Sequence, residues 1–267
     1  MPDESSPQPL DWSQVKRARA GARIGKHIIY HPTLESTNAL GRALLRAGAV
    51  DGAVVVTDDQ TQGRGRHGRH WVAPPASGLA VSVLLRPVPD FPLYTYSMAA
   101  ALATDDVVRA AVGDRCTLKW PNDVLVDGAK VAGILLEIES VAGAWAVVAG
   151  IGLNVNATPD VANATSLAAA RGMPMVERER VLIDLLAALE ERLDSAVSAP
   201  DTLVQVWRDR LETLGQRVRV QGPGMDAVEG LAVDVDAEGA LLVRADDGTL
   251  HTLHAGDVTL STQTVQA

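Results

Sequence analysis

The sequence predicts an α+β fold, in which a mixed β-sheet is flanked by helices and followed by a small C-terminal β-barrel. Strand-like apolar runs such as 79–85 are separated by segments with helical spacing. Two longer apolar runs, at 131–139 and 144–155, lie on either side of a short turn, which favours a hairpin within a mixed sheet. Beyond Gly215, short alternating segments separated by glycine-rich turns predict the barrel.

These features divide the chain into three parts. We expect a flexible tail at 1–25, a large domain at 26–214 that carries the functional residues, and a terminal domain at 215–267. The tail is rich in proline, serine and charged residues, so it should contain at most one short helix. Order should begin near Gly25.

The first regular element that we expect is a capped helix. Ser36, Thr37 and Asn38 precede an apolar stripe of 3.6-residue period that stops at Gly48, which is typical of a helix with a polar N-cap and a glycine C-terminus. The same criteria predict strands at 53–57, 79–85, 117–120, 131–139 and 144–155, and helices at 96–112, 177–193 and 202–214.

Composition excludes several classes of protein. A formal net charge of −9 argues against a surface built throughout to hold nucleic acid. The single cysteine, Cys116, excludes an internal disulfide framework and a cysteine-rich zinc site. No secretory signal is visible, and the longest mostly apolar run, 144–155, is too short to span a bilayer. We therefore expect a cytoplasmic protein with no membrane partner.

One short stretch concentrates glycine and arginine: Gly63, Arg64, Gly65, Arg66, His67, Gly68 and Arg69. Glycines let the backbone approach a ligand closely, and guanidinium groups suit carboxylate or phosphate. Ordering each residue costs roughly 1–2 kcal/mol, and only Trp71 and Val72 offer apolar area to offset that cost. We expect a loop that is mobile when empty and closes over an anionic ligand, with a solvated basic loop as the alternative.

The loop is not a standard nucleotide-binding motif. No Gly-Lys-Ser/Thr run opens a helix, so the sequence contains no P-loop. Gly150 and Gly152 lie near a strand end, but the third glycine of a dinucleotide fingerprint is missing.

Three further features could carry chemistry. Lys119 ends a short strand before Pro121, where it could hold a carboxylate or acyl phosphate oxygen, or could be a surface lysine. Asn122 and Asp123 could form a turn or could orient ATP or Mg²⁺. The cluster at 36–38 could cap its helix or, with Gln60, could hydrogen-bond a neutral amide or urea. Cys116 could be an acyl nucleophile, although a buried thiol is the commoner case.

Five motifs, in this order, resemble those of the biotin protein ligases: 35–38, 60–69, 119–123, 130–135 and 150–154. The resemblance runs from residue 26 to about residue 265, and the terminal domain is similar to the SH3-like module of that family. It implies a class II synthetase-like catalytic domain. It also implies an ATP-dependent ligase that forms biotinyl-AMP and pyrophosphate with Mg²⁺ present, and then passes biotin to a lysine of a biotin carboxyl carrier protein, that of acetyl-CoA carboxylase.

The resemblance also implies roles for single residues. Catalytic roles fall on Lys119, Arg64 and Arg66; the biotin-binding set is Ser36, Thr37, Asn38, Gln60, Arg64, Gly65, Arg66 and Lys119; the ATP-binding set is Arg66, Arg69, Trp71, Asn122 and Asn154. The metal ligands stay unassigned, and weak homodimerisation stays open.

Two rivals and one departure accompany this interpretation. A lipoate protein ligase or octanoyltransferase is the nearest enzyme, and a nucleic-acid-binding module is the rival from another class. Many bacterial relatives carry an N-terminal winged helix and repress transcription, but here fewer than 30 residues precede the first motif. We expect a ligase that binds no specific DNA.

Overall fold

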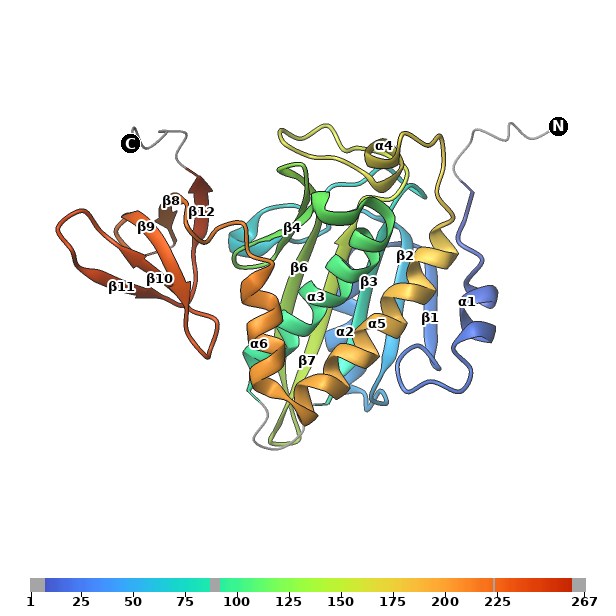
Figure 1. Cartoon of the computed structure of the whole chain (residues 1–267). Coiled ribbons are helices and arrows are strands. Elements are labelled where there is room, and N and C mark those ends of the chain that lie inside the picture. Colours follow the sequence, from blue (N-terminus) through green and yellow to red (C-terminus); the bar gives the residue numbers. More distant parts are fainter. Residues whose placement is uncertain (1–7, 87–91, 223, 261–267) are drawn as a thin grey trace.

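The computed structural model describes residues 8–86, 92–222 and 224–260. A large mixed sheet with helices on both faces forms one body, and a smaller antiparallel sheet lies beside it (Figure 1). The larger body contains α1 (Trp12–Ala18), β1 (Ile28–Leu34), α2 (Thr37–Arg46), β2 (Ala53–Gln60), η1 (Arg66–Gly68), β3 (Leu79–Leu85), α3 (Leu93–Val112), η2 (Gly113–Arg115), β4 (Cys116–Lys119), β5 (Asp123–Val126), β6 (Ala129–Val141), β7 (Ala144–Leu153), α4 (Leu167–Arg171), α5 (Arg178–Ser198) and α6 (Pro200–Asp209).

The large sheet has the strand order β1-β2-β3-β7-β6-β5-β4, in which β1 and β2 are parallel and every other neighbouring pair is antiparallel. The predicted mixed sheet is therefore confirmed, as is the hairpin of β6 and β7. Its turn uses Ala142 and Gly143, both at positive φ, which suits the twist of paired strands.

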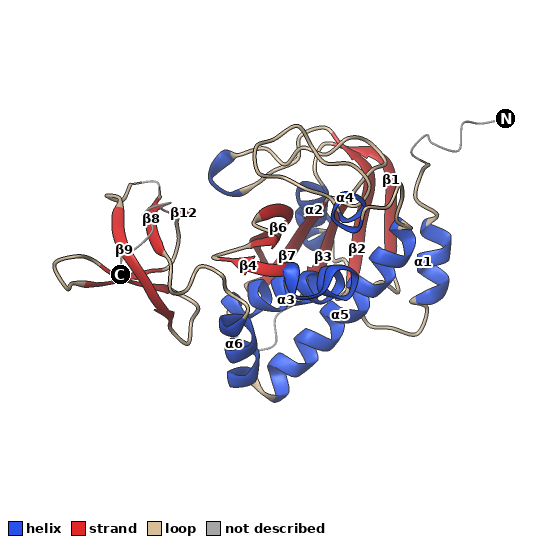
Figure 2. Ribbon diagram, turned by 45° about the horizontal axis from the view of Figure 1, so that its top comes forward, coloured by secondary structure: helices blue, strands red, loops and turns tan. Residues whose placement is uncertain are grey.

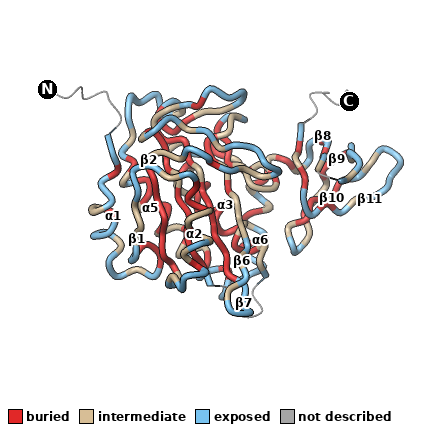
Figure 3. The backbone as a smooth tube through the Cα atoms, turned by 180° about the vertical axis from the view of Figure 1, so that it is seen from behind, coloured by how far each residue is buried: buried red, intermediate tan, exposed pale blue. Residues whose placement is uncertain are grey.

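Helices cover both faces of this sheet. Figure 2 shows α3, α5 and α6 on one face and α2 on the other. The α2 face buries a small apolar group that includes Leu45, Leu84 and Val148, whereas the opposite face holds the larger core. The buried residues concentrate in the central strands and the helix faces that meet them (Figure 3). In the described part of the chain, no helix combines the length and apolar composition needed to cross a bilayer.

The N-terminal segment corrects one expectation. Residues 1–7 lie outside the described residues, but 8–25 are packed and not a flexible tail. Asp11 caps α1 by accepting from the backbone N–H groups of Ser13 and Gln14, and Leu10, Val15 and Ile24 are buried. Composition suggested a tail because the apolar residues here are few, yet each of them has a tertiary contact.

Two strands and one helix boundary also differ from expectation. We did not predict β1, whose Pro32 is tolerated because β1 is an edge strand. We also did not predict β5, which begins at Asp123, a residue considered only as a turn former or as a ligand-orienting group. The helix expected at 202–214 ends at Asp209. After it, the Leu118 backbone N–H donates to the Arg210 carbonyl at 2.9 Å and the Glu212 N–H donates to the Leu118 carbonyl at 2.9 Å, so pairing with β4 replaces the last helical turn.

The C-terminal region is an antiparallel sheet with the order β11-β10-β9-β8-β12. Its strands are β8 (Arg217–Gln221), β9 (Val228–Val235), β10 (Leu241–Arg244), β11 (Leu250–Leu253) and β12 (Asp257–Leu260). Of the expected Gly-Pro-Gly turn, Pro223 lies outside the described residues, as do 261–267. The sheet is tied to the larger body because the Trp120 indole N–H donates to the Gly239 carbonyl at 2.9 Å.

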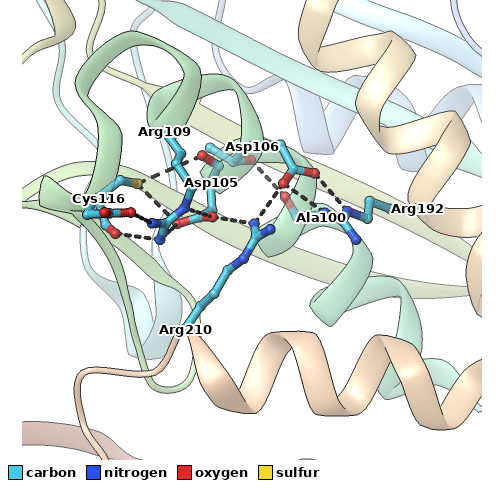
Figure 4. A network of polar contacts seen from close by, with 9 residues as sticks. Ala100, Asp105, Asp106, Arg109, Cys116, Arg192 and Arg210 are labelled. Carbon is cyan, nitrogen blue, oxygen red and sulfur yellow. Dashed lines mark hydrogen bonds and ion pairs between the residues drawn. The ribbon is translucent and has the colours of Figure 1, made fainter.

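A buried ionic network fixes the start of β4 between helices (Figure 4). The side chain of Asp105 on α3 is fully buried, at 0% exposure, and accepts hydrogen bonds from Arg109, Arg210 and the Cys116 thiol. Asp106 pairs with Arg192 on α5 at 2.7 Å and with Arg210. The network therefore joins α3, α5, β4 and the residue that follows α6.

We predict that Asp105→Ala lowers the free energy of unfolding by about 3–5 kcal/mol, because it leaves arginines without their buried counter-charge. Urea denaturation followed by circular dichroism measures the loss. Asp114→Ala is the matched control, since Asp114 is the other carboxylate that pairs with Arg109 but is fully exposed. Equal stability of the two variants would contradict a structural role for the network.

Candidate functional site

A cavity of about 250 Å³ opens at the end of the large sheet, beneath the Gly/Arg loop and against β12. Nearly all of the residues selected from the sequence line it: Ser36, Thr37, Asn38, Gln60, Arg64, Gly65, Arg66, Arg69, Trp71, Lys119 and Asn122. They come from the start of α2, the end of β2, the loop itself and the β4–β5 connection. The exception is Asn154, which does not line the cavity.

The start of α2 supplies neutral polar groups. The Ser36 hydroxyl accepts from the Ala39 backbone N–H at 3.4 Å, so Ser36 does cap the helix. Thr37 instead faces Gln60, whose Oε1 accepts from the Thr37 backbone N–H at 2.8 Å and from the Thr37 hydroxyl at 3.1 Å. The capping interpretation therefore accounts for Ser36 alone, and Thr37 and Gln60 form a joined wall.

Asn38 continues this wall through a buried serine that sequence reasoning missed. The Ser82 hydroxyl lies 2.6 Å from Asn38 Oδ1 and 2.8 Å from the Thr37 hydroxyl, and the Asn38 amide donates to Glu137 at 2.8 Å. A Cβ on Gly150 would stand 2.2 Å from Asn38 Oδ1, so only glycine leaves room for this arrangement. The signal in the sequence was a lone hydroxyl inside the apolar strand 79–85.

The Gly/Arg loop is folded over the cavity mouth. The Gly65 backbone N–H donates to the Arg69 carbonyl at 2.8 Å, and the Trp71 N–H donates to the Gly63 carbonyl at 2.9 Å. His67 and Gly68 take positive φ angles of 53° and 75°, which makes the sharp reversal at the tip. Such a short turn exposes the loop tip, where His67, Gly68 and Arg69 face solvent.

Two arginines of the loop contact the C-terminal sheet. Arg69 forms an ion pair with Asp257, and Arg66 Nη1 lies 3.4 Å from the Gly256 carbonyl and 3.4 Å from Asn122 Oδ1. Burial lowers the pKa of Arg66 from its ordinary value, an effect that Asp257 opposes. Asp257 lines the cavity but was not expected there, because no sequence pattern links it to a loop 188 residues away.

Two lysines line the cavity, although only Lys119 was singled out. Lys119 ends β4, and among the described residues its ammonium has no hydrogen-bond or ion-pair partner. Lys130 lies 2.6 Å from Asp123 Oδ1 and 5.7 Å from the ring centre of Trp71. Lys130 was part of a family motif but had no role; the Asp-Gly turn at 127–128 was the signal that a hairpin returns it to Asp123.

Trp71 is pressed onto the sheet at a glycine. A Cβ on Gly152 would lie 2.3 Å from the indole of Trp71, so the β7 backbone serves as its platform. The indole also contacts the Lys130 ammonium, which lies over its ring. Trp71 is therefore fixed at the cavity wall while the loop tip before it is exposed.

The two expected asparagines differ in position. Asn122 donates to the Ile134 carbonyl at 2.6 Å while its Oδ1 faces Arg66, so it both shapes the turn and lines the cavity. Asn154 is buried, at 2% exposure, and donates to the Thr165 carbonyl at 3.0 Å. Its Oδ1 is the one buried side-chain oxygen without a hydrogen-bond partner among the described residues. The structure thus separates Asn154 from the other predicted residues.

The chemistry of the cavity suits anions and a neutral polar group. Within the described ranges, no three His, Cys, Asp or Glu side chains form a group that could hold a metal ion. The nearby carboxylates of Asp123 and Asp257 are each paired with a cation. A metal that arrives on a phosphate ligand would fit, because Mg²⁺ needs only one or two protein carboxylates when phosphates supply the rest.

Neutral hydrogen-bonding side chains and a group of cations thus line one cavity, which suits a ligand that carries both a neutral polar group and an anionic group. Residues 30–156 match the biotin/lipoate A/B protein ligase family, and residues 213–261 match the biotin protein ligase C terminal domain. The biotin–[acetyl-CoA-carboxylase] ligase of Mycobacterium tuberculosis is 38% identical over 260 residues, which cover 94% of this chain and 95% of that protein.

Further relatives agree. The biotin–[acetyl-CoA-carboxylase] ligase of Paracoccus denitrificans is 37% identical over 229 residues, covering 80% of this chain and 92% of that protein. The structure of a biotin protein ligase from Aquifex aeolicus in complex with biotin and ATP superposes with a TM-score of 0.76 and 26% identity, covering 88% of this chain and 99% of that one. The chain belongs to the biotin protein ligase family.

Cys116 is placed away from this cavity, which bears on the transferase rival. It is buried in the network of Figure 4, where burial raises the pKa of its thiol well above the ordinary value and the neighbouring Asp105 adds to that rise. A thiol nucleophile needs a lowered pKa and access to substrate, and Cys116 has neither.

We predict that Cys116 in the folded protein resists alkylation by iodoacetamide at pH 8 and reacts readily once the chain is unfolded in urea. The reason is that the reactive thiolate forms only when the thiol returns to its ordinary pKa in water. Mass spectrometry of the intact protein counts the labelled fraction. Equal labelling rates in the two states would show an accessible, activated thiol and would support the octanoyltransferase alternative.

Proposed function

We propose that this chain is an ATP-dependent biotin protein ligase that converts biotin to biotinyl-AMP and then transfers the biotinyl group to a lysine of a biotin carboxyl carrier protein. The observation that carries the proposal is the shared cavity, where a neutral polar wall and a cationic loop face the same space. Biotin has both kinds of group, a ureido ring and a carboxylate. The relatives named above are biotin ligases, which favours biotin over lipoate.

The neutral wall is the proposed ureido site. Thr37 and Gln60 are joined by hydrogen bonds, Ser82 on β3 links Thr37 to Asn38, and Ser36 lines the cavity beside them as the cap of α2. A urea carbonyl accepts and its two N–H groups donate, so it needs both donors and acceptors around it. Hydroxyl and amide side chains provide both without a net charge.

The two lysines are the proposed charge-stabilising groups of the first step. The biotin carboxylate attacks the α-phosphate of ATP, so negative charge must be held on both reactants while they approach. We assigned this role to Lys119, and we now extend it to Lys130. Lys130 is already oriented by Asp123 and the Trp71 ring, and such preorganised charge stabilises a transition state at little reorganisation cost.

The loop and its surroundings are the proposed nucleotide site. Arg66 and Arg69 contact the C-terminal sheet at Gly256 and Asp257, and Trp71 and Asn122 line the same cavity. Mg²⁺ would enter as part of the MgATP substrate, where it screens phosphate charge, and Asp123 is the carboxylate best placed beside it. Asn154 lies outside the cavity, so we propose for it only the role of holding the Thr165 turn.

The loop also has a proposed protective role. Biotinyl-AMP is a mixed anhydride that water can hydrolyse, and a closed loop keeps water from it. Arg64, Gly65 and Arg66 lie over the cavity mouth and would hold the adenylate until a carrier lysine attacks its acyl carbon and releases AMP.

The remaining expectations stay proposals. A cytoplasmic location is supported by a chain with one, unpaired cysteine. The absence of specific DNA binding and of repressor activity stays a prediction, as does weak self-association.

We predict that the protein, a biotin carrier domain, MgATP and biotin give a carrier lysine heavier by one biotinyl group. Lipoate in place of biotin should give little product, because it lacks the ureido ring that the neutral wall fits. Mass spectrometry of the carrier reads the result. Preferential lipoylation would contradict the proposal and favour a lipoate protein ligase. Modification without ATP would exclude both ligases.

We predict that Lys130→Ala and Lys119→Ala each slow biotin-dependent pyrophosphate release, by about 100- to 1000-fold for a charge that acts in the transition state. Both variants should fold, since each removes a solvent-accessible side chain at the cavity wall. Lys26→Ala is the control, because Lys26 is exposed and does not line the cavity. A lysine whose replacement leaves turnover at the control value has no part in the first step.

A further inference from the structure

A buried ion pair lies behind the cavity and has no part in the function described so far. Asp58, near the end of β2, and Arg178, the first residue of α5, are joined at 2.8 Å with side-chain exposures of 8% and 5%. Isolated charges are costly to bury, so a pair this enclosed must satisfy its other hydrogen bonds locally. The partners of these two side chains define what the pair holds together.

The Asp58 carboxylate collects donors from the N-terminal half of the chain. The Leu10 backbone N–H lies 3.1 Å and 3.2 Å from its two oxygens, and the Tyr30 hydroxyl donates to Oδ2. Burial and this hydrogen bond raise the pKa of Tyr30 to about 12, so Tyr30 remains a donor at any physiological pH. Asp58 thus ties the N-terminal segment and β1 to β2.

Arg178 gathers carbonyl groups from two other segments. Its Nη1 donates to the Gly78 carbonyl at 3.1 Å, and its Nη2 donates to the Gln8 carbonyl at 2.6 Å. The backbone of Asp58 closes the arrangement, because its carbonyl accepts from the Ala76 N–H at 2.8 Å. The chain that leaves β2 after Gln60 and returns to β3 at Leu79 is therefore fastened at both ends to one ion pair.

The Asp58–Arg178 pair lies next to Gln60 and Trp71, which belong to the proposed biotin and nucleotide sites. Asp58 and Gln60 are two positions apart on β2, so their side chains leave the same face of the strand. Between them and Trp71 there is only a small void of about 10 Å³, which Gly78 also lines. A shift of Asp58 or Arg178 should therefore displace Gln60 and Trp71, because little empty space separates these side chains.

We propose that Asp58 and Arg178 are positioning residues for the ligand-binding loop. Together with the N-terminal segment at Gln8 to Leu10 they form a clamp that holds the two ends of the loop segment. The start and end of the loop segment are held by this buried ion pair, whereas residues 67–69 at its tip are exposed. This inference rests on the proposed function, because it assigns the pair's effect to biotin binding and activation. The N-terminal segment then helps to set the geometry of the site.

The test compares Arg178→Met and Arg178→Lys with wild type in steady-state adenylation. Arg178→Met should raise the biotin KM by about tenfold or more with a smaller change in kcat, because Gln60 shares a face of β2 with Asp58, whereas Lys119 lies on β4 at the other edge of the sheet. Arg178→Lys keeps the charge beside Asp58 and should recover part of the affinity. Calorimetric titration with biotin alone should give the same order.

Two further variants separate positioning from stability. Arg192→Gln is the matched control: it breaks a second, partly buried ion pair of α5, with Asp106, and Arg192 lines neither the cavity nor the void beside Gln60. It should lower the melting temperature without changing the biotin KM. Tyr30→Phe removes one donor to Asp58 at constant shape, and should raise the KM by a few-fold even if Arg178→Met fails to fold.

The outcomes are distinguishable. If wild type and Arg192→Gln activate biotin but Tyr30→Phe and every folded Arg178 variant keep the wild-type KM, the clamp is structural only and the inference is wrong. If Arg192→Gln raises the KM as much as Arg178→Met does, the effect belongs to lost stability and the inference is again wrong. If wild type itself does not activate biotin, the proposed function fails first.

Discussion

The repulsion among cations gathered around one cavity is the constraint on which the rest of the structure depends. Arg64, Arg66, Arg69, Lys119 and Lys130 all line the same space in a protein whose net charge is −9. Like charges at such proximity destabilise a fold unless counter-charges are supplied. Asp257 pairs with Arg69 and Asp123 pairs with Lys130, so the chain provides its own anions where a ligand would bring phosphates and a carboxylate.

The fold satisfies this constraint by bringing distant segments to one end of the sheet. The antiparallel hairpin of β5 and β6 returns Lys130 to Asp123, and the C-terminal sheet presents Asp257 to the loop. Gly150 and Gly152 have no side chains, so they leave room for Asn38 and Trp71 to pack against the backbone of β7. Because the supports are strands and helix ends, the polar wall is rigid, whereas the loop tip at residues 67–69 is exposed and is held to the C-terminal sheet by Arg66 and Arg69.

Periodicity and turn residues were sufficient to predict the regular elements that bury one clear face. The α2 stripe, β3 and the β6–β7 hairpin lie where the sequence placed them, because their apolar spacing has only one packing solution. β1 was missed because Pro32 weakens the strand pattern. The N-terminal segment was misjudged as a tail because Leu10 and Val15 become buried only through tertiary contacts.

The sequence selected cavity-lining residues that belong to local motifs and missed those that depend on tertiary geometry. The loop and the cluster at 36–38 were found because their residue types are unusual for a loop and a helix start. Ser82 and Asp257 were not, since each acts through a partner far away in sequence. Lys130 was in a family motif without a role, although its partner Asp123 lies just across a hairpin. Asn154 was expected beside the nucleotide but faces the Thr165 carbonyl, a difference that no local pattern reveals.

The central claim is that the Gly/Arg loop closes over an activated acid, and limited trypsin digestion tests it most directly. The cleavage rate at Arg64, Arg66 and Arg69 is measured by mass spectrometry for the free protein, with biotin alone, and with biotin and MgATP together. The account predicts that these sites are cut readily in the free protein and are strongly protected when both substrates are present, while cleavage elsewhere is unchanged. Equal cleavage of the loop in all three conditions would contradict it.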